Sequence, residues 1–191
     1  MNFKWKPSNH EDFEEINKWH KYLLEYYGNE NAYTAYLTSE GVLLGDLVES
    51  VSENNPPLIN TSTCHSAFLD GELSGFSLIT IFEEGGKVVA DIEVLAVKPT
   101  SQSKGVGTAM IFDLVKNREQ ILGLHIDSFT SQIHESNKAS TRVFEKNGFS
   151  NVGTKPGLRE SFNLYKKMLD SVVTGNEVPD YTQSSSAEIL K

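Results

Sequence analysis

The residues best suited to binding a ligand form the turn Gln102–Gly107, with the sequence QSKGVG. It follows a β-rich segment that ends at Pro99, and a helix is expected to begin within it. Backbone N–H groups at a helix start have no acceptor inside the helix, and the helix N-terminus carries partial positive charge. Gly105 and Gly107 lack a Cβ, so a bulky anion can approach the main chain, and Lys104 can add a positive charge. The turn therefore predicts a phosphate-binding site, with close packing at a helix start as the alternative.

Two common phosphate-binding motifs do not fit this turn. A dinucleotide fingerprint needs a third glycine three residues after Gly107, where Met110 stands, and it belongs to an early βαβ unit. A P-loop needs Gly-Lys-Ser/Thr after a four-residue gap, and that order is missing here. The turn thus indicates a phosphate ligand of another class, with a different kind of nucleotide binder as the remaining alternative.

Asp91 and Glu93 form the second group of residues that can do chemistry. They lie two apart in a β-rich segment, so alternation places both on one face of a strand, together with Leu95 and Val97. A carboxylate held on a strand can act as a general base. The alternatives are carboxylates that are exposed to solvent and carboxylates that serve as partners of ion pairs.

Helices and strands in a mixed order must position these residues. Apolar residues recur at spacings of three and four from Phe13 to Tyr26, which predicts one face of a helix with Gly28 as its C-cap. The order of elements predicts one α/β domain over residues 1–169, with a mixed sheet of six or seven strands, and a polar, loose tail over 170–191. Along the chain we expect a strand at 3–6, a helix at 10–27, weaker helices at 31–37 and 41–51, an antiparallel meander at 63–99, a helix within 100–123, a strand at 124–130, a helix at 136–148, and strands at 149–154 and 161–169, the last with a helix as its alternative.

This combination resembles the GNAT N-acetyltransferase superfamily. Gln102–Gly107 resembles the family's Arg/Gln-x-x-Gly-x-Gly/Ala pyrophosphate loop, and the preceding IEVLAVKP resembles its fourth strand. The resemblance covers roughly residues 64–169 and implies the single-domain GNAT acyl-CoA N-acyltransferase fold, a mostly antiparallel sheet with flanking helices. A second family signature is matched downstream, at the usual separation, by Asn137, Ala139, Phe144, Glu145, Lys146, Gly148 and Phe149.

The resemblance implies acetyl-CoA as co-substrate and assigns residues to it. Main-chain groups of Leu95, Ala96 and Val97 are expected to pair with the pantetheine arm like a missing strand. Asn137 is expected to hydrogen-bond the cofactor, with Ser140 and Phe144 near its thiol end. The pyrophosphate is expected to lie on the backbone of Gln102, Ser103, Lys104, Gly105, Val106, Gly107 and Thr108.

The implied activity is acetyl transfer to a primary amine, on a small molecule or a protein. Most amines are protonated at pH 7, so a general base must first remove a proton. Glu93, and after it Asp91, stands where family members place a base or a carboxylate that holds water. A backbone N–H near Leu95 to Val97 can stabilise the oxyanion.

Phe144 departs from the family pattern, because many members have a tyrosine at this position. Phenylalanine has no proton to give to the departing thiolate, which then leaves unaided or takes a proton from another group. This departure keeps open an alternative function, a non-catalytic acetyl-CoA-binding sensor or regulatory module. The possible substitutes for the missing acid are Ser136, Ser140, His134 and Tyr165.

Composition limits the partners and the location. The net charge of −9 argues against a nucleic-acid or anionic-membrane surface. The N-terminus shows no apolar segment typical of a signal peptide, and no apolar run approaches membrane length, so we expect a cytoplasmic protein. Cys64 is the single cysteine and the histidines lack metal-ligand spacing, so no metal is expected. Exposed sheet edges leave a homodimer possible.

Overall fold

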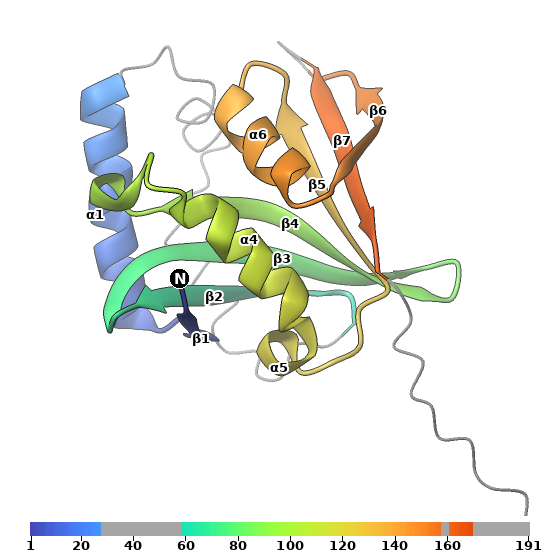
Figure 1. Ribbon diagram of the computed structural model, residues 1–191, viewed down its shortest axis with the longest axis horizontal. Coiled ribbons are helices and arrows are strands. Elements are labelled where there is room, and N and C mark those ends of the chain that lie inside the picture. Colours follow the sequence, from blue (N-terminus) through green and yellow to red (C-terminus); the bar gives the residue numbers. More distant parts are fainter. Residues whose placement is uncertain (28–58, 158–160, 170–191) are drawn as a thin grey trace, which may run out of the picture.

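A computed structural model describes residues 1–27, 59–157 and 161–169 of the chain. These residues form a seven-stranded sheet with helices packed against it (Figure 1), which confirms the predicted α/β fold class. The elements in chain order are β1 (Phe3–Pro7), α1 (His10–Tyr27), β2 (Thr61–Leu69), β3 (Glu72–Glu84), β4 (Lys87–Val97), the 3₁₀ turn η2 (Pro99–Ser101), α4 (Val106–Lys116), α5 (Arg118–Leu122), β5 (Ser128–His134), α6 (Lys138–Lys146), β6 (Ser150–Lys155) and β7 (Phe162–Met168).

The strands follow the order β1-β2-β3-β4-β5-β7-β6 across the sheet. Strands β2, β3 and β4 are the predicted antiparallel meander, and tight turns with a positive φ at Gly71 and Gly85 connect them. All neighbouring strands are antiparallel except β4 and β5, which are parallel. A parallel pair in the middle of the sheet needs a crossover, and α4 and α5 supply it.

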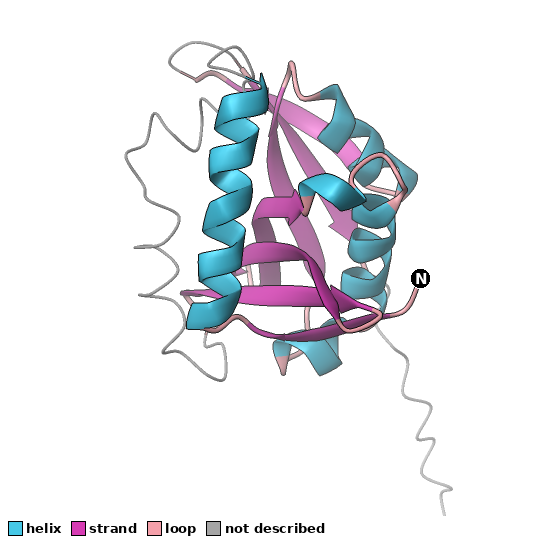
Figure 2. Cartoon of the chain, turned by 90° about the vertical axis from the view of Figure 1, so that its left-hand side faces the viewer, coloured by secondary structure: helices cyan, strands magenta, loops and turns pink. Residues whose placement is uncertain are grey.

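Helix α1 covers one face of the sheet, and α4, α5 and α6 lie on the other (Figure 2). The predicted apolar stripe of α1 is buried, with Phe13, Ile16 and Trp19 packed in one cluster with Cys64 and Leu78. The main core lies on the opposite face, where removal of apolar surface from water drives the packing. Its fully buried members include Ile79, Ile81, Ile92, Ile111, Leu114, Leu122 and Phe129.

Two predicted boundaries were wrong or incomplete. The strand expected at 124–130 begins later, at Ser128, because Asp127 is engaged at the preceding bend. Its N–H donates to the Val88 carbonyl (2.9 Å), and its carboxylate accepts from the Val88 N–H (2.8 Å). The helix expected within 100–123 is divided at Asn117, whose φ of −105° and ψ of 23° are not helical. Residues 162–168 form strand β7, which confirms the strand predicted at 161–169 over its helical alternative.

The expected helices at 31–37 and 41–51 and the tail at 170–191 lie outside the described residues. In the part of the chain that the structure describes, no helix is both long and apolar enough to cross a membrane.

Candidate active site

The candidate site lies where β4 and β5 separate. The two strands pair only at Val89–Ser128, Ala90–Phe129 and Asp91–Thr130, yet β4 continues to Val97 and β5 to His134. Figure 1 shows them diverging from this short paired region. Beyond Asp91, the edge of β4 that faces β5 therefore has no strand partner among the described residues. An extended ligand can pair with such an edge through main-chain hydrogen bonds.

A β-bulge at Glu93 marks the start of the separation. The register with β3 shifts there: Leu78 pairs with Val94, but its neighbour Ile79 pairs with Ile92. Two buried serines bond the carbonyls on either side, with Ser77 Oγ donating to Val94 (3.0 Å) and Ser131 Oγ donating to Ile92 (2.8 Å). The bulge is therefore fixed by satisfied hydrogen bonds in a buried setting.

The bulge overturns one expectation about the faces of β4. Simple alternation placed Leu95 and Val97 on the same face as the two carboxylates. Instead, Val94 and Ala96 pack in the cluster of α1, while Leu95 and Val97 pack against the cluster that contains Val106 and Met110 of α4. One extra residue reverses the side-chain phase of everything that follows it in the strand.

The two carboxylates have different surroundings. Asp91 is half-buried at the last paired position of β4 and β5, and it accepts a hydrogen bond from Thr130 Oγ1 (2.5 Å). Burial raises the pKa of Asp91, although Thr130 and the positive charge of Lys155 oppose that shift. Glu93 is exposed, and its carboxylate accepts a hydrogen bond from Thr80 Oγ1. The structure thus brings both predicted carboxylates to the point where the strands separate.

The glycine turn lies at the far end of the same β4 edge. Gln102 Nε2 donates to the Val97 carbonyl (3.1 Å), which ties the turn to the strand. Gly105 is the N-cap of α4 with φ of 78°, in the left-handed region, and Ser103 also has a positive φ. Lys104 is exposed, and its ammonium donates to the Thr100 carbonyl (2.8 Å). The first N–H groups of α4 have no acceptor within the helix, so the turn retains the donors that an anion requires.

Gly107 has a different role from Gly105. A Cβ at Gly107 would meet Val97 Cγ2 at 3.4 Å and Val143 Cγ2 at 3.7 Å. These two valines belong to β4 and α6, so the start of α4 lies close to both elements. A Cβ at Gly105 would meet nothing, and only its φ requires glycine.

The second signature lies at the start of α6. Asn137 is the N-cap, and its side-chain oxygen accepts the Ser140 N–H (3.1 Å). Its amide group still has donors for a ligand. Phe144 is buried in the main core and packs edge-to-face on Phe149, with the ring centroids 4.9 Å apart. The structure gives Phe144 a packing role, and its contact with a cofactor stays a prediction.

The candidate substitutes for a thiol-end acid are dispersed. His134 Nδ1 and Ser136 Oγ are hydrogen-bonded at 2.8 Å at the end of β5. Tyr165 is buried on β7, and its hydroxyl donates to Glu145 Oε1 (3.4 Å). Within the described ranges, no cluster of three or more histidine, cysteine or acidic side chains is placed to hold a metal ion.

Comparison with known proteins identifies the family. The sequence profile of the acetyltransferase (GNAT) family matches residues 9–149, more than half of the chain. The chain belongs to the GNAT acetyltransferase family. An N-acetyltransferase 9-like protein of Nematostella vectensis is 31% identical over 72 residues, which are 38% of this chain and 35% of that protein. The match thus spans about a third of the length of this curated relative.

Solved structures of GNAT proteins share the fold at low sequence identity. The PaiA N-acetyltransferase of Thermoplasma acidophilum, in complex with coenzyme A, superposes with a TM-score of 0.62 at 19% identity over 88% of this chain and 100% of that chain. The ribosomal L7/L12 alpha-N-protein acetyltransferase RimL gives a TM-score of 0.67 at 14% identity over 89% and 96% of the two chains. An aminoglycoside acetyltransferase, AAC(6')-Ib with coenzyme A and kanamycin, gives 0.61 at 17% identity over 87% and 95%.

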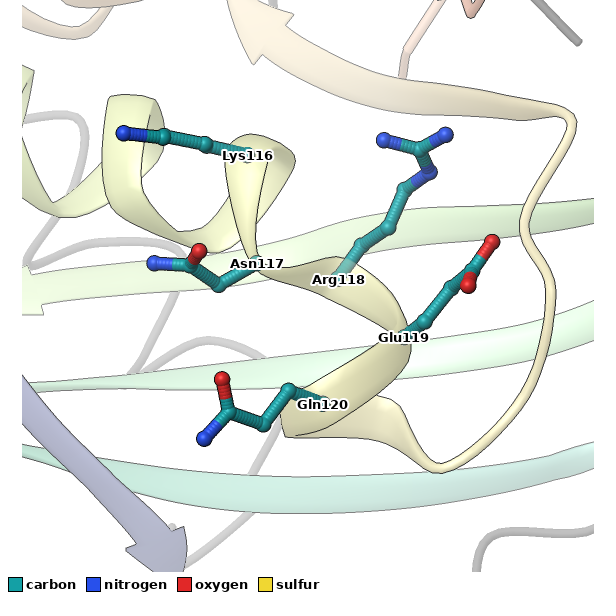
Figure 3. Close-up of a pocket in the computed structure, with 5 residues that line it drawn as sticks. All are labelled: Lys116, Asn117, Arg118, Glu119 and Gln120. Atoms are coloured by element: carbon teal, nitrogen blue, oxygen red, sulfur yellow. The ribbon is translucent and has the colours of Figure 1, made fainter. Parts of the chain in front are cut away.

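A surface pocket of this GNAT protein lies outside the candidate site. The pocket in Figure 3 is lined by the consecutive residues Lys116–Gln120, where α4 meets α5. The side chains of Lys116, Asn117 and Gln120 extend to one side and those of Arg118 and Glu119 to another (Figure 3), and none of these residues comes from β4, β5 or the glycine turn. The pocket therefore lies at the end of α4 opposite to Gly105 and has no part in the candidate site.

The hydroxyl groups that bond Asp91 and Glu93 were not predicted from the sequence. Ser62, Thr80 and Thr130 lie on β2, β3 and β5, and each is a direct register partner within one row across the sheet that includes Asp91. Serine and threonine are common in strands, so residue type alone does not indicate that these three lie beside a carboxylate. Only the register shows that they meet the carboxylates.

Proposed function

We propose that this chain transfers the acetyl group of acetyl-CoA to a primary amine of a small molecule or a protein. One observation carries the proposal. The edge of β4 that has no strand partner among the described residues runs from two carboxylates, Asp91 and Glu93, to a glycine turn at a helix start. A base, an extended binding edge and an anion site thus follow one another along a single strand.

The described residues fit acetyl-CoA in three respects. The turn from Gln102 to Thr108 offers backbone donors for the pyrophosphate, and Lys104 adds a positive charge. The edge of β4 at Leu95–Val97 offers main-chain groups to the amides of the pantetheine arm. Asn137 offers its amide group. When bound, acetyl-CoA supplies an activated acyl group as a thioester.

The chain's own residues then handle the proton and the charge. Glu93, exposed at the bulge, accepts the proton of the incoming ammonium group directly or through water, with Asp91 as the second candidate. A backbone N–H of Leu95–Val97 stabilises the negative charge that develops on the carbonyl oxygen. The apolar side chains on both faces of this strand segment limit the access of water.

A release assay for the CoA thiol with a panel of primary amines tests the proposal. We expect thiol release with at least one amine, and a loss of kcat by about 10²–10⁴ in Glu93→Gln, because a general base contributes on that order. Glu83→Gln is the matched control, since it makes the same change on an exposed carboxylate of β3. Acetyl-CoA binding without turnover of any amine would contradict the proposal.

The second candidate is a non-catalytic acetyl-CoA-binding sensor or regulatory module. Phe144 favours it, because this buried ring replaces the tyrosine of many family members and has no proton to give. A sensor should bind acetyl-CoA and release no thiol. Substitution of Asp91 and Glu93 should then leave its acetyl-CoA affinity unchanged.

A further inference from the structure

On the face of the sheet that α1 covers, an apolar row of register partners is followed by a polar row. Cys64 of β2, Leu78 of β3 and Val94 of β4 belong to the apolar cluster under α1. Two residues away on β2 and β3, on the same face, are Ser62 and Thr80. Beside them on β4 and β5 lie Asp91 and Thr130, and Glu93 reaches the row from the bulge. Hydroxyl groups thus lie against both proposed catalytic carboxylates.

The hydrogen bonds of this row have one consistent direction. Ser62 Oγ and Thr80 Oγ1 are 2.6 Å apart, and either hydroxyl can donate in that pair taken alone. Thr80 also bonds a carboxylate oxygen of Glu93, and an ionised carboxylate can only accept. A threonine hydroxyl has one proton, so Thr80 gives it to Glu93 and must accept from Ser62. The order is therefore Ser62 to Thr80 to Glu93.

We propose that Thr80 and Ser62 are positioning residues that hold the Glu93 carboxylate toward the amine. This inference rests on the proposed function and adds the residues that orient its base. Glu93 is exposed and has a flexible side chain, so without a fixed donor its carboxylate would sample many orientations. Thr80 is half-buried on the neighbouring strand, where its stiff β-branched side chain fixes the hydroxyl. Its bond leaves the second carboxylate oxygen available to accept the proton.

Steady-state kinetics of Thr80→Val with the amine found in the thiol-release screen test this arrangement. Valine keeps the shape and removes the hydroxyl, so we expect kcat to fall about tenfold, the order implied by losing one hydrogen bond to a charged group. Thr80→Ser should restore most of the rate, and Ser62→Ala should lower it less than Thr80→Val. The KM for acetyl-CoA should change by less than about twofold, because neither hydroxyl lies on the cofactor edge.

Thr130→Val is the matched control, because it removes the hydroxyl that bonds Asp91 in place of the one that bonds Glu93. Its effect on kcat should be smaller than that of Thr80→Val. A wild-type kcat in Thr80→Val, or a larger loss in Thr130→Val, would overturn the proposal.

A measurement without turnover separates this proposal from the function itself. The Thr80 methyl signal, followed by NMR in the free protein, should move with pH, because Thr80 donates to an ionisable side chain. The movement should disappear in Glu93→Gln and persist in Asp91→Asn. If the signal follows Asp91 or does not move, the positioning proposal fails even for an active enzyme. If the signal behaves as expected but no amine is acetylated, only the proposed function fails.

Discussion

At the scale of single residues, the Asp91 carboxylate lies in surroundings that disfavour its charge. Asp91 is half-buried, and burial raises its pKa, because a low-dielectric setting disfavours the ionised form. The folded chain therefore holds this proton more tightly than the unfolded chain does. By linkage, the contribution of Asp91 to the free energy of unfolding falls as pH rises from its pKa in the unfolded chain through its higher pKa in the folded chain. At neutral pH, the charge of Asp91 therefore lowers the free energy of unfolding.

Asp91→Asn should consequently leave the fold as stable as wild type at pH 7, or raise the melting temperature by a few degrees. The asparagine oxygen can still accept the Thr130 hydrogen bond, and the buried charge is gone. Differential scanning calorimetry at pH 7 and pH 4 measures this, and the gain should shrink at the lower pH. A clear drop in melting temperature at pH 7 would show that the charge of Asp91 stabilises the fold.

At the scale of elements, the site depends on how β4 ends and α4 begins. The left-handed φ of 78° at Gly105 turns the chain from the loop into α4. An L-residue in that conformation costs about 1–2 kcal/mol. Gly107, two residues later, is helical, and a Cβ added there would make only ordinary van der Waals contacts.

Gly105→Ala should lower the free energy of unfolding by about 1–2 kcal/mol and weaken acetyl-CoA binding, because it strains the turn that presents the N–H donors. Gly107→Ala is the matched control. Its methyl group meets Val97 and Val143 at contact distance, and alanine favours the helix, so stability should be kept or slightly raised. Urea denaturation and calorimetric titration measure both properties. Equal effects of the two substitutions would contradict this division of roles.

Some of these elements followed from the sequence and others did not. The helix at α1, the meander and the glycine turn were predicted because periodicity, turn residues and glycine spacing are local signals. The bulge at Glu93 was not, because it depends on which β3 residues face β4. For the same reason, the hydrogen bonds that connect Ser62 and Thr80 to Glu93 could not be predicted from the sequence. The late start of β5 depends on the contacts of Asp127 with Val88, which lies far away in the chain.

At the scale of the whole molecule, a buried histidine links the sheet to the crossover. His65 of β2 is 2% exposed, and desolvation lowers its pKa to about 4, against a hydrogen bond with the Ile121 backbone of α5 that favours the charged form. Protonation is therefore easier in the unfolded chain, whose histidine pKa is about 6.5. Stability from this group is complete above that value and is lost as pH falls toward 4.

Acid should therefore destabilise the whole domain in a window set by His65. Between pH 6.5 and pH 4, we expect a loss of about 3 kcal/mol from this group, at about 1.4 kcal/mol per pH unit. Urea denaturation over this range measures the slope, and His65→Leu should flatten it. An unchanged slope in the variant would assign the acid sensitivity to other groups.

The most direct test of the central claim is a calorimetric titration of the folded protein with acetyl-CoA, beside CoA, NAD and ATP. Because we propose that the glycine turn holds the pyrophosphate and that the edge of β4 pairs with the pantetheine arm, acetyl-CoA and CoA should bind, and NAD and ATP should bind much more weakly. Equal binding of all four ligands would reduce the site to a general phosphate binder. No binding of acetyl-CoA or CoA would mean that the turn only packs α4 against the sheet, and it would contradict both the enzyme and the sensor.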